Sequence, residues 1–285
     1  MLKVTAEKTT LRGIVTQPDR PAGRGQKLQA TDVKRAASAY DIPIFEPVAL
    51  KQFASELRGD YDVFIVASYG RILPPAVLEL PHVGALNVHP SLLPQYRGAT
   101  PIQAALRNGD SQTGVSIMLM DSGMDTGPLV LQETVAIQPD EDYGMLHDRL
   151  AQVGARLLSH AIDLAAENNL GPRPQAGEAS ITKPLTKDDL KIDWRWPAQQ
   201  VVDATRALSP EPAARTEIGG VNVKLLRAKH VDVPEKSEPG KMLGNGDALL
   251  VACGEGAVQI EDLIPASRAK MSGAQFKRWL KQQSR

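Results

Sequence analysis

The stretch GALNVHPSLLPQYRGATPIQ, residues Gly84–Gln103, decides the architecture of the chain. Its opening apolar run has the composition of a buried strand, and Pro90 ends that strand because proline has no N–H to donate to a sheet. Side chains two positions apart on a strand share a face, so Asn87 and His89 are predicted to point the same way. An isolated Asn-x-His pair is more often an ordinary strand end. A functional interpretation therefore needs a second polar residue placed in the same way.

Short β-rich runs alternate with helical patterns on both sides of this stretch. The expected strands are Leu11–Gln17, Tyr61–Gly70 and Thr113–Gly123, and the expected helices are Thr31–Tyr40, capped by Thr31, and Tyr143–Asn168. Alternating strands and helices predict an α/β fold with a doubly wound (Rossmann-like) parallel sheet. In such a fold ligands bind at the carboxyl ends of the strands, which is where Asn87 and His89 fall.

The second half of the chain has a different pattern. Residues 171–187, GPRPQAGEASITKPLTK, are rich in Gly, Pro, Ser and Thr and lack periodicity, which is typical of a linker. One helix is expected near Pro197–Leu208, and the short β-patterned runs after it, separated by Gly and Pro turns, favour a small barrel or sandwich. The predicted division is a domain over residues 1–172, a linker over 173–192 and a C-terminal domain over 193–285.

The composition is that of a globular protein whose net charge is zero, so it has no strong overall electrostatic field. The 33 Lys and Arg residues balance 33 Asp and Glu, so a nucleic acid would have to meet a local basic surface. No apolar run reaches the roughly 18–20 residues that cross a bilayer, and the N-terminus lacks the apolar core of a signal peptide. The single cysteine, Cys253, excludes an intrachain disulfide, and the five histidines show no ligand spacing. We therefore predict a cytoplasmic protein with neither a membrane nor a metal as partner.

A second strand end carries carboxylates. The segment VSIMLMDSGMDTG, Val115–Gly127, has the pattern of a strand followed by a Gly-rich turn that holds Asp121 and Asp125. A carboxylate beside His89 would fix the tautomer of the imidazole and raise its pKa. Such a pair can remove a proton from an amine while the amide of Asn87 donates to a developing oxyanion. The combination suits transfer of an acyl group between nitrogens without a covalent intermediate or a metal.

A basic loop follows the first expected strand. Residues Gln17–Leu28, QPDRPAGRGQKL, place Arg20, Arg24 and Lys27 among prolines and glycines. The loop has neither the G-x-G-x-x-G spacing of a dinucleotide site nor a Walker sequence. Two interpretations stay open at this point: a mobile surface connection, or a basic finger that touches the phosphate backbone of a nucleic acid.

Several segments in fixed order carry a family resemblance. They are VTQPDRPAGRG at residues 15–25, VASYGRILP at 66–74, NVHPSLLPQYRGATPIQ at 87–103 and MDSGMDTG at 120–127. With them the chain resembles the folate-dependent formyltransferases and, among these, the methionyl-tRNA formyltransferases. KIDW at residues 191–194 and PASRAKM at 265–271 continue the resemblance, which covers residues 11–280.

The resemblance implies that the formyl group of 10-formyltetrahydrofolate passes to the α-amine of methionyl initiator tRNA, for the start of translation. By position, Asn87, His89 and Asp125 match the catalytic residues of the family. The residues that match the folate site are Ser91, Leu92, Leu93 and Pro94, with Ser68, Tyr69, Gly70, Asp142 and Gly144 nearby. The residues that match the loop directed at the acceptor stem of the tRNA are Arg20, Arg24 and Lys27. The C-terminal domain is then expected to be a small β-barrel resembling an OB fold, with basic residues that contribute to tRNA binding. We also expect a monomer.

The start of the chain departs from the family pattern. The family normally begins with a strand of the type RIIFAGTPEFA and a helix before GIVTQPDRP, whereas here only MLKVTAEKTT precedes that region. A central strand lost from a parallel sheet leaves two unpaired edges, which we expect in the folded chain. Two alternatives to the tRNA enzyme stay open. One is a formyltransferase for a nucleotide sugar or another small amine, and the other is a truncated, inactive RNA-binding remnant.

Overall fold

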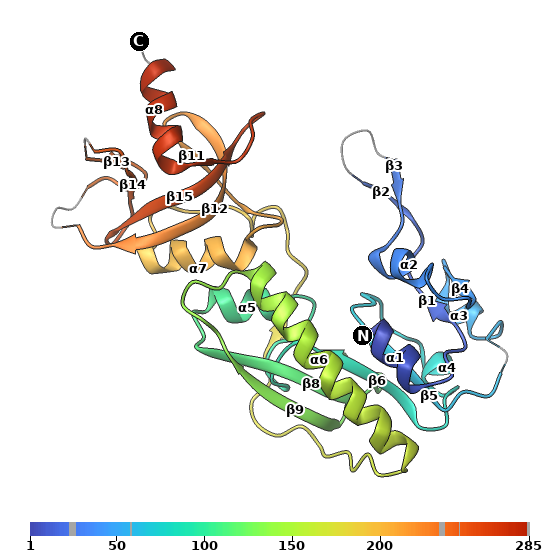
Figure 1. Cartoon of the computed structure of the whole chain (residues 1–285). Coiled ribbons are helices and arrows are strands. Elements are labelled where there is room, and N and C mark those ends of the chain that lie inside the picture. Colours follow the sequence, from blue (N-terminus) through green and yellow to red (C-terminus); the bar gives the residue numbers. More distant parts are fainter. Residues whose placement is uncertain (23–26, 58, 234–236, 245, 284–285) are drawn as a thin grey trace. The chain divides into compact units, whose positions relative to one another are not determined.

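The computed structural model describes residues 1–285 except 23–26, 58, 234–236, 245 and 284–285, and it contains two compact units (Figure 1). The first unit comprises Met1–Ala99, Gly114–Thr134 and Leu150–Ile181, and the second comprises Thr100–Thr113, Val135–Arg149 and Thr182–Arg285. Each unit is thus assembled from separate stretches of the chain. The domain boundaries at residues 172 and 193 stay a prediction.

The first unit is built around a four-stranded sheet in the order β5-β6-β8-β9. The strands are β5 (Val63–Ala67), β6 (Gly84–His89), β8 (Gln112–Leu119) and β9 (Leu129–Ala136). β5 and β6 are parallel, with Ala67 beside Val88, so both strands end at the same edge of the sheet. This arrangement confirms the predicted Rossmann-like class and puts the end of β6 where a ligand site is expected.

One predicted strand runs in the opposite direction. β8 pairs with β6 antiparallel, with Ser116 opposite His89, whereas the alternating pattern predicted another parallel strand. The reason lies in the connection between the two strands. Its helix, α5 (Pro101–Arg107), has 7 residues. At about 1.5 Å per residue it is too short to carry the chain back to the start of β6. β8 therefore begins at the edge where β6 ends.

Among the residues that the structure describes, three two-stranded sheets accompany the larger ones. They are β1 (Ile14–Val15) with β4 (Ile44–Phe45), β2 (Arg20–Ala22) with β3 (Lys27–Gln29), and β7 (Arg97–Gly98) with β10 (Ile181–Thr182). Among the described residues β1 pairs only with β4, in parallel, and β5 pairs only with β6. In the described residues, β1 and β5 thus each pair with one strand only.

The helices between the N-terminus and residue 166 are mostly short. The short ones are α1 (Leu2–Lys8), α2 (Asp32–Ala37), α3 (Leu50–Phe53) and α4 (Pro75–Leu78), and the predicted amphipathic helix is α6 (Tyr143–Ala166). The hydroxyl of Thr31 accepts a hydrogen bond from the Lys34 N–H at 3.1 Å, which confirms the predicted cap of α2. At Gly154 of α6 a Cβ atom would lie 2.9 Å from a side chain of β6, so a glycine allows the helix to approach the sheet closely. In the described part of the chain, no helix has the length and apolarity to cross a membrane.

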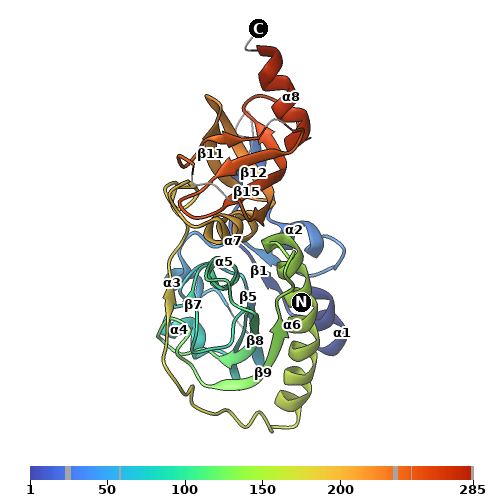
Figure 2. The same cartoon turned by 90° about the vertical axis from the view of Figure 1, so that its left-hand side faces the viewer.

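The second unit contains a curled antiparallel sheet in the order β11-β12-β15-β14-β13, with β16 paired to β15 (Figure 2). Its elements are β11 (Ala214–Ile218), β12 (Val221–Val231), β13 (Met242–Leu243), β14 (Leu249–Ala252), β15 (Ala257–Pro265), β16 (Met271–Ser272), α7 (Ala198–Leu208) and α8 (Gly273–Gln283). The buried side chains of Val201, Leu225 and Phe276 join α7, the sheet and α8 in one core. This half-barrel confirms the predicted class of the C-terminal domain.

The stretch predicted as a linker is hydrogen-bonded to the first unit. Arg173 exchanges two backbone hydrogen bonds with Leu129, at 2.8 and 2.9 Å. The carbonyl of Ser180 accepts from the backbone N–H of Arg97 at 2.9 Å. The segment Arg173–Ser180, which we call the strap, is therefore part of the first unit although its composition is that of a loop.

Candidate active site

Three side chains meet beyond the carboxyl end of β6. Asn87 and His89 leave the same face of the strand, as predicted, and both approach Asp125 in the turn after β8. The Asn87 Nδ2 atom lies 3.5 Å from Asp125 Oδ1, and His89 Nδ1 lies 3.6 Å from Asp125 Oδ2. The structure thus brings an amide, an imidazole and a carboxylate together from the ends of two strands.

Of the two carboxylates in that turn, Asp125 is the one beside the imidazole. Its Oδ2 atom accepts a hydrogen bond from the Gly98 N–H at 2.7 Å, and its side chain is 15% exposed. Asp121 organises the turn instead, because its Oδ1 atom accepts from the Gly123 N–H at 3.0 Å and from Thr126 Oγ1 at 2.6 Å. Asp125 has a φ of 53°, in the left-handed region that few non-glycine residues adopt. Such a conformation persists only where the surroundings hold it.

His89 is buried, and its proton arrangement follows from its partners. The Nε2–H group donates to the carbonyl of Tyr96 at 2.9 Å. A neutral ring that donates from Nε2 keeps its lone pair on Nδ1, the nitrogen that faces Asp125. Burial lowers the pKa of His89 from its ordinary 6.5, against the opposing effects of Asp125 and the Tyr96 carbonyl. The sequence predicted a raised pKa, and that prediction is wrong because desolvation outweighs the carboxylate.

The lowered pKa of His89 leads to an expected pH dependence of stability. The unfolded chain takes up a proton on this residue near pH 6.5, while the folded chain resists protonation until a lower pH. The free energy of unfolding should therefore keep this contribution above pH 6.5 and lose it as the pH falls toward the folded pKa. Urea unfolding at about pH 7.5 and about pH 5 measures the loss, which should be smaller in His89→Asn. An equal loss in both proteins would contradict it.

The predicted folate segment Ser91–Pro94 is a well-supported loop directly after β6. Ser116 of β8 donates through Oγ to the carbonyl of Ser91 at 2.7 Å and accepts from the Leu93 N–H at 3.2 Å. Gln132 of β9 donates to the carbonyl of Leu93 at 3.0 Å and to Ser116 Oγ at 2.9 Å. Sequence reasoning missed Ser116 and Gln132 because nothing distinguishes them from ordinary polar residues of a strand.

The turn Ser68–Gly70 lies at the same edge of the sheet. It follows β5 directly, and the parallel pairing puts it beside the end of β6. The carbonyl of Tyr69 accepts from Gln17 Nε2 at 2.8 Å, which ties the turn to the start of the basic loop. Leu92 fills the space next to Gly114, where a Cβ atom would lie 2.4 Å from the leucine Cδ2. The predicted folate residues of the first unit therefore gather around the end of β6.

Asp142 and Gly144 belong to the second unit. Asp142 accepts from the Met145 N–H at 3.0 Å at the start of α6, and from Ser209 Oγ at 3.3 Å. The N–H of Gly144 donates to the carbonyl of Ser209 at 3.1 Å, and a Cβ atom at Gly144 would lie 2.8 Å from Pro210. These two residues thus join the start of α6 to the end of α7. Their contact with a folate stays a prediction.

Within the basic loop β2 pairs with β3 antiparallel, and we call these two paired strands the basic finger (Figure 1). Ala22 on β2 is the partner of Lys27 on β3. Arg20 is exposed, and its Nη2 atom donates to Gln17 Oε1 at 2.5 Å. Arg24 lies outside the described residues. The pairing shows that β2 and β3 are regular strands, and a contact of this loop with a nucleic acid stays a prediction.

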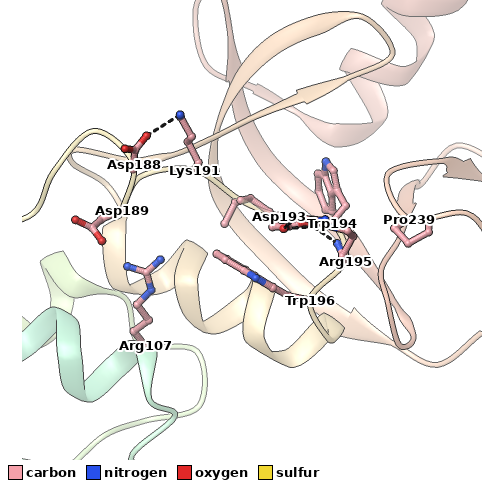
Figure 3. Close-up of a pocket in the computed structure, with 10 residues that line it drawn as sticks. Arg107, Asp188, Asp189, Lys191, Asp193, Trp194, Arg195, Trp196 and Pro239 are labelled. Atoms are coloured by element: carbon pink, nitrogen blue, oxygen red, sulfur yellow. Dashed lines mark hydrogen bonds and ion pairs between the residues drawn. The ribbon is translucent and has the colours of Figure 1, made fainter.

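A further pocket lies in the second unit, and its lining includes none of the predicted catalytic, folate or tRNA residues (Figure 3). Arg107 lies over the ring of Trp196, 6.0 Å from its centroid. The carboxylate of Asp188 accepts from Lys191 Nζ at 2.7 Å, and that of Asp193 accepts from Arg195 Nε at 2.9 Å. The hydrogen bond from Arg195 lowers the pKa of Asp193 to about 2. Because these carboxylates are held in ion pairs, we assign no reaction to the pocket.

A Rossmann-like sheet that gathers an amide, a neutral imidazole and a carboxylate at one strand end has the layout of a group-transfer enzyme. Comparison with protein families identifies the kind of group-transfer enzyme. The family described as "Formyl transferase" matches residues 2–162, and the family described as "Formyl transferase, C-terminal domain" matches residues 184–280. The chain belongs to the formyl transferase family.

Individual relatives agree with this assignment. The protein named "Methionyl-tRNA formyltransferase" of Parvibaculum lavamentivorans is 45% identical over 273 residues, which cover 93% of this chain and 87% of that protein. A protein of the same name from Thiobacillus denitrificans is 43% identical over 269 residues, covering 92% of this chain and 86% of that protein. This chain is therefore similar to those proteins along most of its length.

Solved structures show the same fold at lower identity. HypX from Aquifex aeolicus, in complex with tetrahydrofolic acid, has a TM-score of 0.67 and 17% identity, covering 95% of this chain and 48% of that one. An N-formyltransferase from Helicobacter canadensis, in complex with folinic acid and dTDP-3-aminofucose, has a TM-score of 0.63 and 17% identity, covering 90% of this chain and 87% of that one. At such identities the likeness establishes the fold alone.

Proposed function

We propose that this protein transfers the formyl group of 10-formyltetrahydrofolate to the α-amine of methionine carried by initiator tRNA. The observation that carries the proposal is the convergence of Asn87, His89 and Asp125 at the end of β6 in a member of the formyl transferase family. The relatives named methionyl-tRNA formyltransferase, 45% and 43% identical, support methionyl-tRNA as the acceptor. We also infer, from the sequence, a monomeric and cytoplasmic enzyme.

In this proposal His89 accepts the proton of the attacking amine. The neutral amine forms a bond to the formyl carbon, and its nitrogen must then lose a proton. The lone pair on Nδ1 of neutral His89 takes that proton, which leaves an imidazolium. Asp125, with Oδ2 3.6 Å from Nδ1, stabilises the imidazolium by its opposite charge.

Asn87 stabilises the charge that develops on the formyl oxygen. An amide has two N–H groups, and one of them on Asn87 is directed at Asp125. The other can donate to the oxyanion formed when the amine attacks. Asn87 is 9% exposed, so few waters compete for this donor. When the oxyanion collapses, the bond from the formyl carbon to the nitrogen of the folate donor breaks, and that nitrogen takes up the proton held by His89, which returns to its neutral form.

The residues of the first unit proposed to hold the folate are the loop Ser91–Pro94 and the turn Ser68–Gly70. Ser91 and Leu93 are 0% and 3% exposed, and Ser116 and Gln132 hydrogen-bond their backbone groups, so the loop is a rigid support beside the end of β6. A few well-placed polar groups on a rigid scaffold are typical of such sites.

A direct assay decides between the acceptors. Purified protein is supplied with 10-formyltetrahydrofolate and either methionyl-tRNA or an amino-sugar nucleotide of the kind named for the Helicobacter canadensis structure. We expect N-formyl-methionyl-tRNA as the product. Formylation of the amino sugar alone would establish the small-amine alternative, and RNA binding without turnover on either acceptor would establish the inactive remnant.

Substitutions in the basic finger should alter the salt dependence of tRNA use. Arg20→Ala and Arg24→Ala each remove one positive charge. The rate falls as salt rises, and each lost phosphate contact should make the plot of log rate against log salt less steep, by about 0.7–0.9 in the magnitude of its slope. Initial rates at subsaturating tRNA over a range of salt concentrations measure the slope. Lys51→Ala, which removes an exposed charge on α3, is the matched control and should keep the wild-type slope. Identical slopes in all four proteins would make the finger a surface hairpin without a role in tRNA binding.

A further inference from the structure

One residue of the exposed strap is directed into the protein. Across residues 171–180 every residue is exposed except Gln175. Its Nε2 atom donates to the carbonyls of Asp125 and Gly127, both at 2.8 Å. Its Oε1 atom accepts from Arg97, at 2.7 Å from Nη2 and 3.2 Å from Nε. These partners fix the orientation of the amide, because two carbonyls require N–H groups and a guanidinium requires an oxygen.

The two carbonyls belong to the turn that carries the carboxylate of Asp125. This turn lies tightly against β8, since a Cβ atom at Gly127 would be 1.8 Å from the carbonyl oxygen of Leu119. Asp125 holds a φ of 53°, a conformation that relaxes unless its neighbours maintain it. β8 supports the turn on one side, and Gln175 hydrogen-bonds it from the strap. Gln175 is therefore a support that the strap adds to the turn that carries Asp125.

Gln175 also binds Arg97, the residue before Gly98, whose N–H is hydrogen-bonded to the same carboxylate. The Gly98 N–H donates to Asp125 Oδ2 at 2.7 Å, and Gly98 follows Arg97 on β7. Arg97 is held by Gln175 through its side chain and by Ser180 through its backbone N–H. One amide of the strap therefore connects the turn that carries Asp125 with the strand that binds its carboxylate.

We propose that Gln175 is a positioning residue for Asp125 and thereby for formyl transfer. The rate effect rests on the proposed function, whereas the effect on geometry does not. A displacement of a reacting group by about 1 Å can cost about 100-fold in rate. Loss of the two donated hydrogen bonds should therefore lower kcat by about 10–100-fold and leave the KM for methionyl-tRNA unchanged.

Gln175→Glu separates positioning from simple anchoring of the strap. Glutamate has the length of glutamine and pairs more strongly with Arg97, but it presents an oxygen to the two carbonyls where the amide donated. If Gln175 only anchors the strap, Gln175→Glu should keep the wild-type kcat. If Gln175 positions Asp125, kcat of Gln175→Glu should fall. Arg173→Ala is the matched control. It changes an exposed side chain of the same strap, keeps the backbone pairing with Leu129, and should keep the wild-type kcat.

Hydrogen exchange of the Gly98 amide gives a second readout that needs no substrate. This N–H is bound by the carboxylate of Asp125, so it should exchange faster in Gln175→Glu than in wild type or Arg173→Ala. Unchanged exchange at Gly98 together with unchanged kcat in Gln175→Glu would overturn the proposal. If the wild-type protein formylates no methionyl-tRNA, the proposed function fails, and the exchange at Gly98 still decides whether Gln175 positions Asp125.

Discussion

Asp125→Asn is expected to lower kcat for formylation of methionyl-tRNA by about 10²–10⁴-fold, the usual size of a proton-transfer contribution. Asparagine keeps the shape of the side chain and retains an oxygen for the Gly98 N–H, which lies 2.7 Å from Oδ2 in the wild type. The substitution removes the charge 3.6 Å from His89 Nδ1 that stabilises the imidazolium. The loss should therefore appear in single-turnover rates at saturating substrates, with the KM for tRNA unchanged.

Asp121→Asn is the matched control for this experiment. Asp121 lies in the same turn and accepts hydrogen bonds from Gly123 and Thr126, without being placed beside His89. Its amide variant should keep most of the wild-type rate. A full rate in Asp125→Asn combined with a large loss in Asp121→Asn would transfer the catalytic role to the earlier carboxylate.

Asn87→Ala is expected to lower kcat by about 10²–10³-fold, because one oxyanion donor is typically worth that much. Binding of methionyl-tRNA should stay at the wild-type level, since the donor acts on charge that develops during the reaction. Asn87→Asp tests the same point with nearly unchanged volume, because aspartate accepts hydrogen bonds where the amide donates. Rate measurements alongside filter binding of the tRNA separate the two steps. A defect confined to tRNA binding in both variants would remove Asn87 from the chemical step.

Local rules were sufficient to predict the centre of the site. The spacing of Asn87 and His89 on a strand stopped by Pro90 predicted a shared face at a strand end. In the structure both side chains lie within 3.6 Å of one carboxylate. The cap at Thr31 and the alternation of strands and helices followed in the same way. Each of these features depends on a short window of sequence, which is why the sequence predicts them.

Features set by distant parts of the chain were not predictable. The direction of β8 depends on how far α5 carries the chain, and the pKa of His89 depends on burial by the folded protein. Residue chemistry left two candidate aspartates equivalent, and only the family resemblance pointed to Asp125, the one that the structure places beside His89. Gln175 stands in a Gly- and Pro-rich stretch, 50 residues from the turn it holds, so its composition predicts only a loop. Polar partners of this kind become visible only once the chain is folded.

The hydrogen bonds of the strap also determine which fragments of this enzyme would keep the contacts around Asp125. A fragment ending at residue 172, where the composition changes, would retain Asn87, His89 and Asp125 but lose every contact made by Gln175. A fragment extended to Ile181, the last residue of the first compact unit, would include them. A fragment meant to keep the contacts of Gln175 with the turn of Asp125 therefore has to extend past residue 175, into a stretch whose composition is that of a linker.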